Sequence, residues 1–394
     1  MATPIRNVDL SSTVGPLEGM AGCSRCMVVF RWRTRVVGRA FLDVQDGRVD
    51  VADVLSASAN LGADALRPWL EETVGYDERD LLGTPVYRAT VAICTRERAD
   101  SLDGVLRAVA GLVREGHEVL VVDNAPKTDQ TRQVVERYPG VRYVCELTPG
   151  LNVARNRAIR EANGDIVAFT DDDAFPEQGW LDNLVRNFGD SRVQCVTGVT
   201  LPIELETEAQ EMFETVSTFA HGFRRRVFDG QRDNPIAVGE VGVGANMAIR
   251  RQVIAEVGPF DERLDGGMPT RSGGDHEMFI RLLSAGHRIV YDPAAVSWHR
   301  HRRTHRELVD TLYGYGVGVY AMFTGLLLER RELGVFKQAW LWFRNAHFPE
   351  LRRMLLNRPA TATSELRAAE FRGCLHGPSA WLAARRQRPT GGLR

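Results

Sequence analysis

The stretch Asp-Ile-Val-Ala-Phe-Thr-Asp-Asp-Asp-Ala-Phe, residues 165–175, indicates how this chain folds. The mostly apolar residues 166–170 run directly into three carboxylates, which predicts a strand buried on both faces. An α/β sheet places its ligand crevice at the carboxyl end of such a strand. Because three adjacent carboxylates repel one another, we expect a positive partner there, and a divalent cation carrying a substrate diphosphate fits this position. The alternative is a solvated acidic turn after a core strand.

Composition limits the classes of protein to which the chain can belong. Its 394 residues are 44% hydrophobic and 26% charged, as expected of a globular protein with one large domain or several smaller ones. The net charge of -1 shows no excess of basic residues of the kind that binds phosphate backbones, so we expect no nucleic-acid partner. The six cysteines do not resemble a disulfide framework and no secretory signal is visible, so we expect a cytoplasmic protein.

Strand and helix patterns alternate through the middle of the chain. Strands are predicted at 87–94, 118–122, 141–146 and 166–170, with helical patterns between them. Short links of this kind build parallel β-α-β units with right-handed crossovers. We therefore predict an α/β fold in which helices flank a Rossmann-like, mostly parallel sheet.

Polar side chains follow each of these strands, and a parallel sheet gathers them at one crevice. They are Thr95 and Arg96, Asp123 and Asn124, Arg155 in the helix that opens at Gly150, and Asp171, Asp172 and Asp173. A helix N-terminus and an arginine can hold phosphate oxygens, and a carboxylate can accept hydrogen bonds from a base or ribose. Together they describe a nucleotide-diphosphate site, although no P-loop or GxGxxG fingerprint is present.

Residues 87–301 resemble the family-2 glycosyltransferases of GT-A fold. The motifs that carry the resemblance are Val-Ala-Ile-Cys-Thr-Arg at 91–96, Val-Val-Asp-Asn at 121–124, Gly-Leu-Asn-Val-Ala-Arg-Asn at 150–156 and Phe-Thr-Asp-Asp-Asp at 169–173. Each motif is weak alone, but all four lie in order and each follows a predicted strand. The resemblance implies transfer of a sugar, with inversion, from a nucleotide diphosphate donor to an acceptor hydroxyl, and UDP is the commoner donor nucleotide of the family.

The resemblance also implies a role for each motif on the donor side. Thr95, Arg96 and Asp123, with the neighbouring Asn124, would hold the nucleoside, and Arg155 would reach the donor. The acidic triplet would be the D-x-D-type motif, which binds the ribose and the Mg²⁺ or Mn²⁺ on the diphosphate. A triplet can be registered in two ways, and we favour Asp173 on the metal with Asp171 and Asp172 toward the donor.

A second family-like stretch, Gly-Gly-Asp-His-Glu at 273–277, precedes an apolar helix. The family usually carries Glu-Asp here, so Gly274 is a departure while Asp275 matches the aspartate. Sugar transfer needs a carboxylate that takes the proton of the attacking hydroxyl, and we assign this general base to Asp275. The alternative is that Asp275 only caps the helix, in which case Glu277 is the fallback base.

Further candidates follow from the same resemblance. Asn246 lies in a strand that the family places behind the acceptor pocket, and we assign it and Glu277 to acceptor binding. His299 ends a predicted strand where parts of the family have a metal ligand or donor contact, so we assign it to the metal. A polar surface residue is the alternative for His299.

The chain divides into four predicted parts. Residues 1–26 are expected to be disordered, 27–85 to form a small α/β appendage, 86–305 the GT-A domain and 306–394 a helical C-terminal extension. A basic run at 300–306 precedes apolar and aromatic helices, which suits a lid packed on the catalytic domain and equally a membrane surface. Peripheral membrane contact through 300–345, at the inner face of the membrane, therefore stays open.

The sequence thus predicts a metal-dependent, inverting glycosyltransferase with a nucleotide-sugar donor and a glycan, lipid-linked or small-molecule acceptor. Two alternatives remain. A nucleotidyltransferase would also hold metal and triphosphate with carboxylates, but it would want a Gly- and Lys-rich phosphate loop that is not found. A non-catalytic relative would bind the nucleotide sugar and lack a base.

Overall fold

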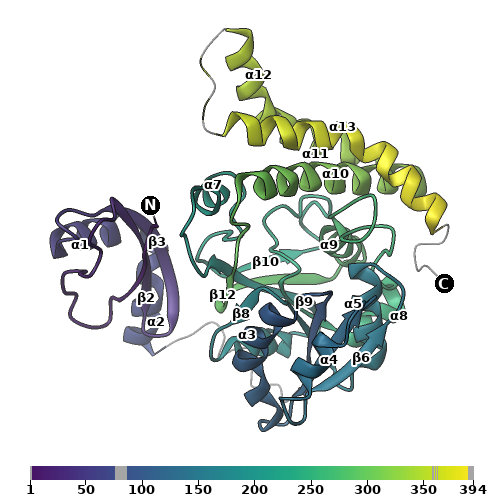
Figure 1. Cartoon of the computed structure of the whole chain (residues 1–394), viewed down its shortest axis with the longest axis horizontal. Helices are drawn as coiled ribbons and strands as arrows, with labels where there is room; N and C mark the ends of the chain where they lie inside the picture. The colour runs from purple at the N-terminus through teal and green to yellow at the C-terminus, as the bar shows by residue number, and fades with distance from the viewer. Residues whose placement is uncertain (1, 76–86, 357–358, 360, 362, 389–394) are drawn as a thin grey trace.

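The computed structural model describes residues 2–75, 87–356, 359, 361 and 363–388. Figure 1 shows three parts: a small N-terminal unit at the left, a central mixed sheet with helices around it, and a layer of C-terminal helices along the top. The helix α12 projects away from this layer. The cavity described below lies between the central sheet and the C-terminal layer.

The N-terminal unit is a three-stranded sheet with two helices. Its elements are β1 (Ile5–Asp9), β2 (Arg25–Trp32), β3 (Arg35–Asp43), α1 (Val51–Ala59) and α2 (Arg67–Val74). The prediction that residues 1–26 are disordered is wrong, because β1 pairs in parallel with β2 and Val8 and Met20 are buried in the core of the unit. The polar, glycine-containing segment gave no strand pattern, and its order depends on pairing with β2. The predicted boundary at residue 85 lies outside the described residues.

Both faces of the N-terminal sheet are covered. Along β2, Val28 and Phe30 face the core of the unit, whereas Met27 and Val29 pack against the ends of strands in the central sheet. An ion pair of 2.9 Å between Arg31 Nη2 and Glu177 Oε2 adds a polar contact. The unit is therefore packed on the central sheet rather than attached only by a linker.

The central sheet has the strand order β10-β12-β9-β11-β7-β4-β5-β6, with β8 paired on β12. The bounds are β4 (Ala89–Thr95), β5 (Glu118–Asn124), β6 (Arg142–Glu146), β7 (Ile166–Asp171), β8 (Ala174–Pro176), β9 (Val193–Pro202), β10 (Arg226–Asp229), β11 (Asn246–Arg250) and β12 (Arg288–His299). Strands β6, β5, β4 and β7 are parallel neighbours, and β9 and β12 form a second parallel pair. Strand β11 is antiparallel to both β7 and β9. The prediction of a mixed α/β fold with a central, mostly parallel sheet is confirmed.

Helices cover the two faces of this sheet with separate hydrophobic cores. The bounds are α3 (Ala99–Val109), α4 (Gln130–Val135), α5 (Leu151–Glu161), α6 (Trp180–Val185), α7 (Glu208–Val216), α8 (Ile254–Val257) and α9 (Gly274–Ser284). In β7, Val167 and Phe169 point into one core while Ile166 and Ala168 point into the other. This alternation explains why the strand that precedes the acidic triplet is apolar at nearly every position.

The C-terminal layer is built on two long helices, α10 (His305–Arg330) and α13 (Ser364–Gln387), with α11 (Gly334–Trp342), a π-helical turn (Phe343–His347) and α12 (Phe348–Leu355) between them. Helix α10 begins with a capping box between Thr304 and Glu307. By length and composition it could cross a membrane, but half of its most apolar window is buried inside the protein. A Cβ on Gly316 would lie 2.0 Å from the backbone oxygen of Glu370, so α10 and α13 meet where no side chain fits.

Candidate active site

The carboxyl ends of three neighbouring parallel strands place the first site residues together. Thr95 at the end of β4 is in register with Asp123 at the end of β5, and Cys94 is in register with Asp171 at the end of β7. The predicted crevice therefore exists, and it lies at the sheet edge that an α/β topology favours.

Within the acidic triplet, Asp172 is held by two donors. Thr95 Oγ1 donates a hydrogen bond of 2.7 Å to Asp172 Oδ2, and Arg98 Nη1 donates one of 2.9 Å to Oδ1. Burial raises the pKa of Asp172 to about 6 although the Arg98 charge opposes this. Arg98 stands three positions after Thr95 among the polar residues that follow the same strand, but we assigned it no role in the predicted site.

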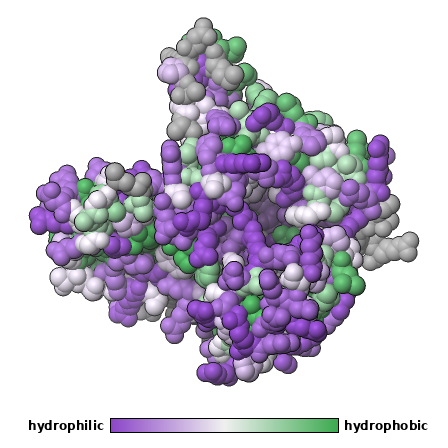
Figure 2. Space-filling view, in the orientation of Figure 1, coloured by the Kyte–Doolittle hydropathy of each residue, from purple (hydrophilic) through white to green (hydrophobic). Residues whose placement is uncertain are grey.

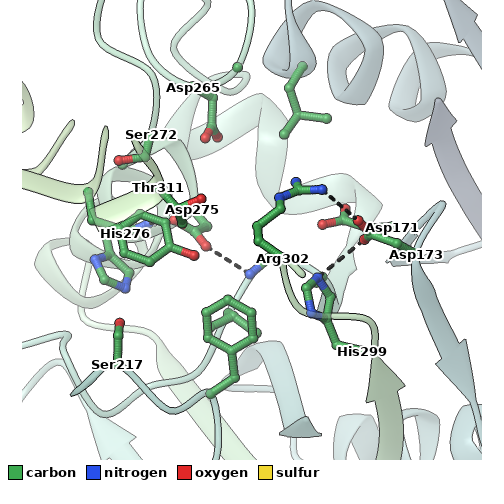
Figure 3. A pocket seen from close by; sticks show the side chains of 18 of the residues that line it. Asp171, Asp173, Ser217, Asp265, Ser272, Asp275, His276, His299, Arg302 and Thr311 are labelled. Carbon is green, nitrogen blue, oxygen red and sulfur yellow. Dashed lines mark hydrogen bonds and ion pairs between the residues drawn. The ribbon is translucent and has the colours of Figure 1, made fainter. Parts of the chain in front are cut away.

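Asp173 lies among positive side chains. Strand β8 pairs with β12 and brings Ala174 opposite His299, which leaves His299 Nε2 3.2 Å from Asp173 Oδ1. Arg98 Nη1 lies 2.8 Å and Arg302 Nη1 3.7 Å from Asp173 Oδ2. Burial alone would raise the pKa of Asp173, but the charges of His299, Arg98 and Arg302 hold it well below its usual range. Figure 3 shows His299 and Arg302 both directed at this carboxylate.

The residues at this corner fit a divalent cation that is completed by a ligand. Asp171, Asp173 and His299 all line the same cavity and offer two carboxylates and an imidazole. Among the described residues, no group of three or more His, Cys, Asp or Glu side chains is arranged as a full metal site. Mg²⁺ is typically bound through one or two carboxylates together with substrate phosphates, so an incomplete protein site is what this chemistry requires.

Arg155 is buried and paired with a carboxylate from a distant loop. Its Nη1 atom lies 2.9 Å from Asp265 Oδ2 and 3.2 Å from Asn152 Oδ1. A Cβ on Gly274 would lie 2.2 Å from Asn152 Nδ2 and 2.4 Å from Asp265 Oδ2. Asp265 therefore occupies the space beside α9 that a side chain at position 274 would need. This explains why a glycine stands at position 274, where the family usually has a glutamate.

Asp275 stands in the first turn of α9 with its carboxylate held by backbone donors. Oδ2 accepts a hydrogen bond of 2.8 Å from the Gly244 N–H, and Oδ1 accepts one of 2.8 Å from the His276 N–H. Burial would raise its pKa, but His276, Arg155 and these two N–H groups lower it, so the carboxylate is ionised near neutral pH. In Figure 3 Asp275 faces Asp171 and Asp173 from the opposite side, with Arg302 extending between them.

One cavity of about 860 Å³ joins these groups. Its volume is in the range of small-molecule and cofactor sites. Figure 2 shows hydrophilic side chains around a hollow near the middle of this face. The predicted site residues that line the cavity are Thr95, Arg96, Asn124, Arg155, Asp171, Asp172, Asp173, Asp275 and His299.

Three predicted site residues do not line it. Asn246 is fully buried: its Oδ1 accepts a hydrogen bond of 2.7 Å from Trp180 Nε1, and its Nδ2 donates to the backbone oxygens of Val199 and Ala295. Its assignment to acceptor binding is wrong, because these bonds use its polar atoms to hold β11 in the core. Glu277 accepts two hydrogen bonds of 2.9 Å from Arg281 Nε one helical turn further on, so it is also structural and not an acceptor contact or fallback base.

Asp123 is a different case. It is fully buried, and its Oδ2 accepts a hydrogen bond of 2.9 Å from the Tyr143 hydroxyl. Burial raises its pKa, and its Oδ1 is buried without a partner. Its contact with a nucleoside stays a prediction, since a movement of the β5 end would be needed to expose it.

Comparison with known proteins agrees with this geometry. Residues 90–258 match the sequence model of Glycosyl transferase family 2. The chain contains a family 2 glycosyltransferase domain. The predicted family is thereby confirmed, and the mixed sheet with its acidic strand end is the arrangement expected of the predicted GT-A fold. The C-terminal helices α10 to α13 lie outside the matched residues.

Two relatives and one solved structure illustrate the similarity. The chain is 29% identical over 282 residues to the pre-mycofactocin glycosyltransferase of Mycobacterium tuberculosis, which covers 69% of this chain and 53% of the relative. It is 25% identical over 269 residues to glycosyltransferase AglE of Haloferax volcanii, covering 66% and 81%. The chain thus spans about half the length of the mycobacterial relative. A mannosyltransferase structure from Pyrobaculum calidifontis aligns over 84% of both chains at 20% identity, with a TM-score of 0.45.

Proposed function

We propose that this protein is an inverting glycosyltransferase that moves a sugar from a nucleotide diphosphate donor to an acceptor hydroxyl, with Asp275 as the general base. The observation that carries the proposal is the position of Asp275. Its ionised carboxylate faces the acidic triplet across one cavity, and both of its oxygens accept backbone hydrogen bonds. A base and a diphosphate site must face each other in this way if a donor is to lie between them.

The reaction is a single displacement. Asp275 accepts the proton of the acceptor hydroxyl while that oxygen forms a bond to the anomeric carbon of the donor. The bond from this carbon to the diphosphate oxygen breaks, and its electron pair leaves with the nucleoside diphosphate. Attack and departure occur on opposite faces of the sugar, so the anomeric configuration inverts.

The donor half of the cavity would receive the nucleotide. Asp171, Asp173 and His299 would hold Mg²⁺ or Mn²⁺ together with the diphosphate, and Arg302 and Arg155 would add positive charge beside it. When bound, the cation supplies charge that neutralises the leaving diphosphate. Uridine is our first candidate for the base because it is the commoner donor nucleotide of the family.

A nucleotidyltransferase remains the second candidate class, since it also uses carboxylates at a sheet edge. The two activities release different products: a glycosyltransferase releases a nucleoside diphosphate, and a nucleotidyltransferase releases pyrophosphate from a nucleoside triphosphate. The partly buried, ionised Asp275 favours glycosyl transfer because that reaction needs a base for the acceptor hydroxyl. The same carboxylate argues against a non-catalytic protein that only binds a nucleotide sugar.

The location of the protein is part of the proposal. A cytoplasmic protein at the inner face of the membrane fits the C-terminal helices, where Leu333, Phe336, Trp340 and Phe348 are exposed next to Arg344. Aromatic and basic side chains on one surface suit contact with anionic lipid.

The test combines a donor panel with one variant. Thermal unfolding is followed with UDP-, dTDP- and GDP-sugars, each with Mn²⁺ and with EDTA, for the wild type and Asp275→Asn. We expect one nucleotide class to raise the Tm of both proteins only when Mn²⁺ is present. With the donor so identified, Asp275→Asn should lose at least about 100-fold in transfer. Near-normal turnover of the variant would overturn the base, and no donor effect would overturn the donor site.

A further inference from the structure

Part of the cavity lining is apolar and aromatic and is not used by the proposed donor site, and we call this part the second lobe. This lobe is bounded by α7, the turn after it, α10, the end of α11 with the π-helical turn, and α13. Its side chains include Phe213, Val216, Phe219, Tyr315, Val319 and Trp342. Three of these six come from the C-terminal layer, beyond the residues that match the family.

The lobe is lined by apolar and aromatic side chains from α7, the turn after it and α10. Phe213 and Phe219 pack edge to face with ring centroids 5.0 Å apart, and Val216 lines the cavity with them. Tyr315 and Val319 stand one helical turn apart on α10, so they form a single stripe that faces the cavity, and Tyr315 belongs to the same hydrophobic cluster as Phe213. Surfaces of this composition bind apolar and aromatic groups through the burial of nonpolar surface.

The wall formed by α10 is held in place from behind. A Cβ on Gly316 would lie 2.0 Å from Glu370 O, and one on Gly373 would lie 2.1 Å from Tyr313 O. Because of these contacts α10 and α13 pack closely along their backbones, so Tyr315 and Val319 are held in position in the absence of a ligand. A preformed apolar wall lowers the cost of binding a rigid ring.

The far end of the lobe offers charges that are already paired. Arg367 Nη1 donates a hydrogen bond of 2.9 Å to Glu370 Oε2, and Arg367 Nη2 donates one of 3.0 Å to the backbone oxygen of Val216. This pair can take part in a hydrogen bond with a neutral ligand. It gives a phosphate or carboxylate on the ligand little net attraction, because the positive charge is compensated.

We infer that the second lobe binds the acceptor through an aromatic or alkyl group attached to its reacting hydroxyl, so that the acceptor is an aglycone-type molecule rather than a free oligosaccharide. This inference rests on the proposed function, because Asp275 lines the same cavity and, as the proposed base, defines where the hydroxyl must lie. The ring or alkyl group then lies against the aromatic side chains that line this part of the cavity, such as Phe219, Tyr315 and Trp342.

The test is a binding measurement with 2-naphthol, a fluorescent aromatic alcohol, on the full chain without donor. Trp342→Ala should weaken the binding of 2-naphthol by about tenfold, since the change removes a large aromatic surface from the lobe. Trp340→Ala is the matched control: it lies on the same helix, is 59% exposed and does not line the cavity, so it should bind as the wild type does. Val319→Thr keeps the side-chain shape and should weaken binding several-fold.

Each result of this test either supports or contradicts binding of an apolar acceptor group in the second lobe. Weaker binding in Trp342→Ala and Val319→Thr, with Trp340→Ala unchanged, supports the inference. No binding of 2-naphthol, equal binding by all variants, or Trp342-dependent binding of cellotriose instead would overturn it. Donor stabilisation by a nucleotide sugar with Mn²⁺ is measured on the same proteins. Failure of the donor to bind while 2-naphthol binds would count against the proposed function and leave the lobe an aromatic-binding site.

Discussion

At the scale of single residues, the site depends on Asp265, although no sequence motif marks this side chain as part of the site. It has a positive φ of 78°, it lines the cavity, and it pairs with Arg155. Asp265→Asn keeps the shape, and asparagine tolerates this backbone conformation. We expect kcat to fall about tenfold or more. The reason is that an uncompensated Arg155 would pair with Asp275 and weaken it as a base.

The pH dependence of the same variant tests this reason. Burial raises the pKa of Asp265, whereas the pKa of Asp275 is lowered, so on acidification Asp265 loses its charge first. The protonated wild type then resembles the variant, and the ratio of their kcat values should shrink as the pH falls from about 8 to about 5. Asp261→Asn is the control, because Asp261 pairs with Arg263 on the same loop outside the cavity. A constant ratio across this range would refute the role of Asp265.

The other site residues differ in whether the neighbouring sequence alone predicts their place in the site. Thr95, Asp171 and Asp275 could be predicted because each follows an apolar run or opens a helix, and topology alone then brings them to one edge. Asp265 and Arg302 could not, since their positions depend on how loops return to the cavity. Gly274 was the one sequence feature that pointed to Asp265. The glycine leaves space beside α9 that another side chain must fill, and Asp265 fills it.

At the scale of elements, the glycines of α10 are explained by its neighbour and not by its own sequence. An apolar and aromatic helix was expected after the basic run, but its partner α13 lies more than 30 residues further along the chain. Gly316→Ala would push a methyl group into the backbone of α13, and we expect it to lower the free energy of unfolding by about 1–3 kcal/mol.

The matched control stands two residues away on the same helix. A Cβ on Gly314 would meet its nearest neighbour, Arg271 Nε, at 3.5 Å, which is ordinary contact. Gly314→Ala should therefore leave stability unchanged or raise it by up to about 1 kcal/mol through helix propensity. Urea unfolding of both variants measures the difference. Equal effects of the two substitutions would mean that the close approach of α10 and α13 does not limit stability.

At the scale of the whole molecule, the three parts are joined by contacts that no local pattern encodes. Residues 1–26 were expected to be disordered because the segment contains several Gly and Pro residues and shows no strand pattern, yet β1 is completed by β2, and β2 is covered by the central sheet. In the same way, α10 has the composition of a membrane-spanning helix, and its burial becomes evident only once α13 and the catalytic domain are in place.

The exposed part of the C-terminal layer gives the last prediction. Leu333, Phe336 and Trp340 are 69%, 61% and 59% exposed on the segment that leads toward the projecting α12, where Arg352 is also exposed (Figure 1). If this surface contacts a bilayer, the protein should float with vesicles that contain anionic lipid and remain unbound with neutral ones, because basic residues add about 1 kcal/mol each near an anionic surface. Phe336→Ser with Trp340→Ser should reduce flotation several-fold and leave thermal stability unchanged, since both side chains face solvent. Flotation that is absent with anionic vesicles, or equal for the double variant, would contradict membrane contact through this surface.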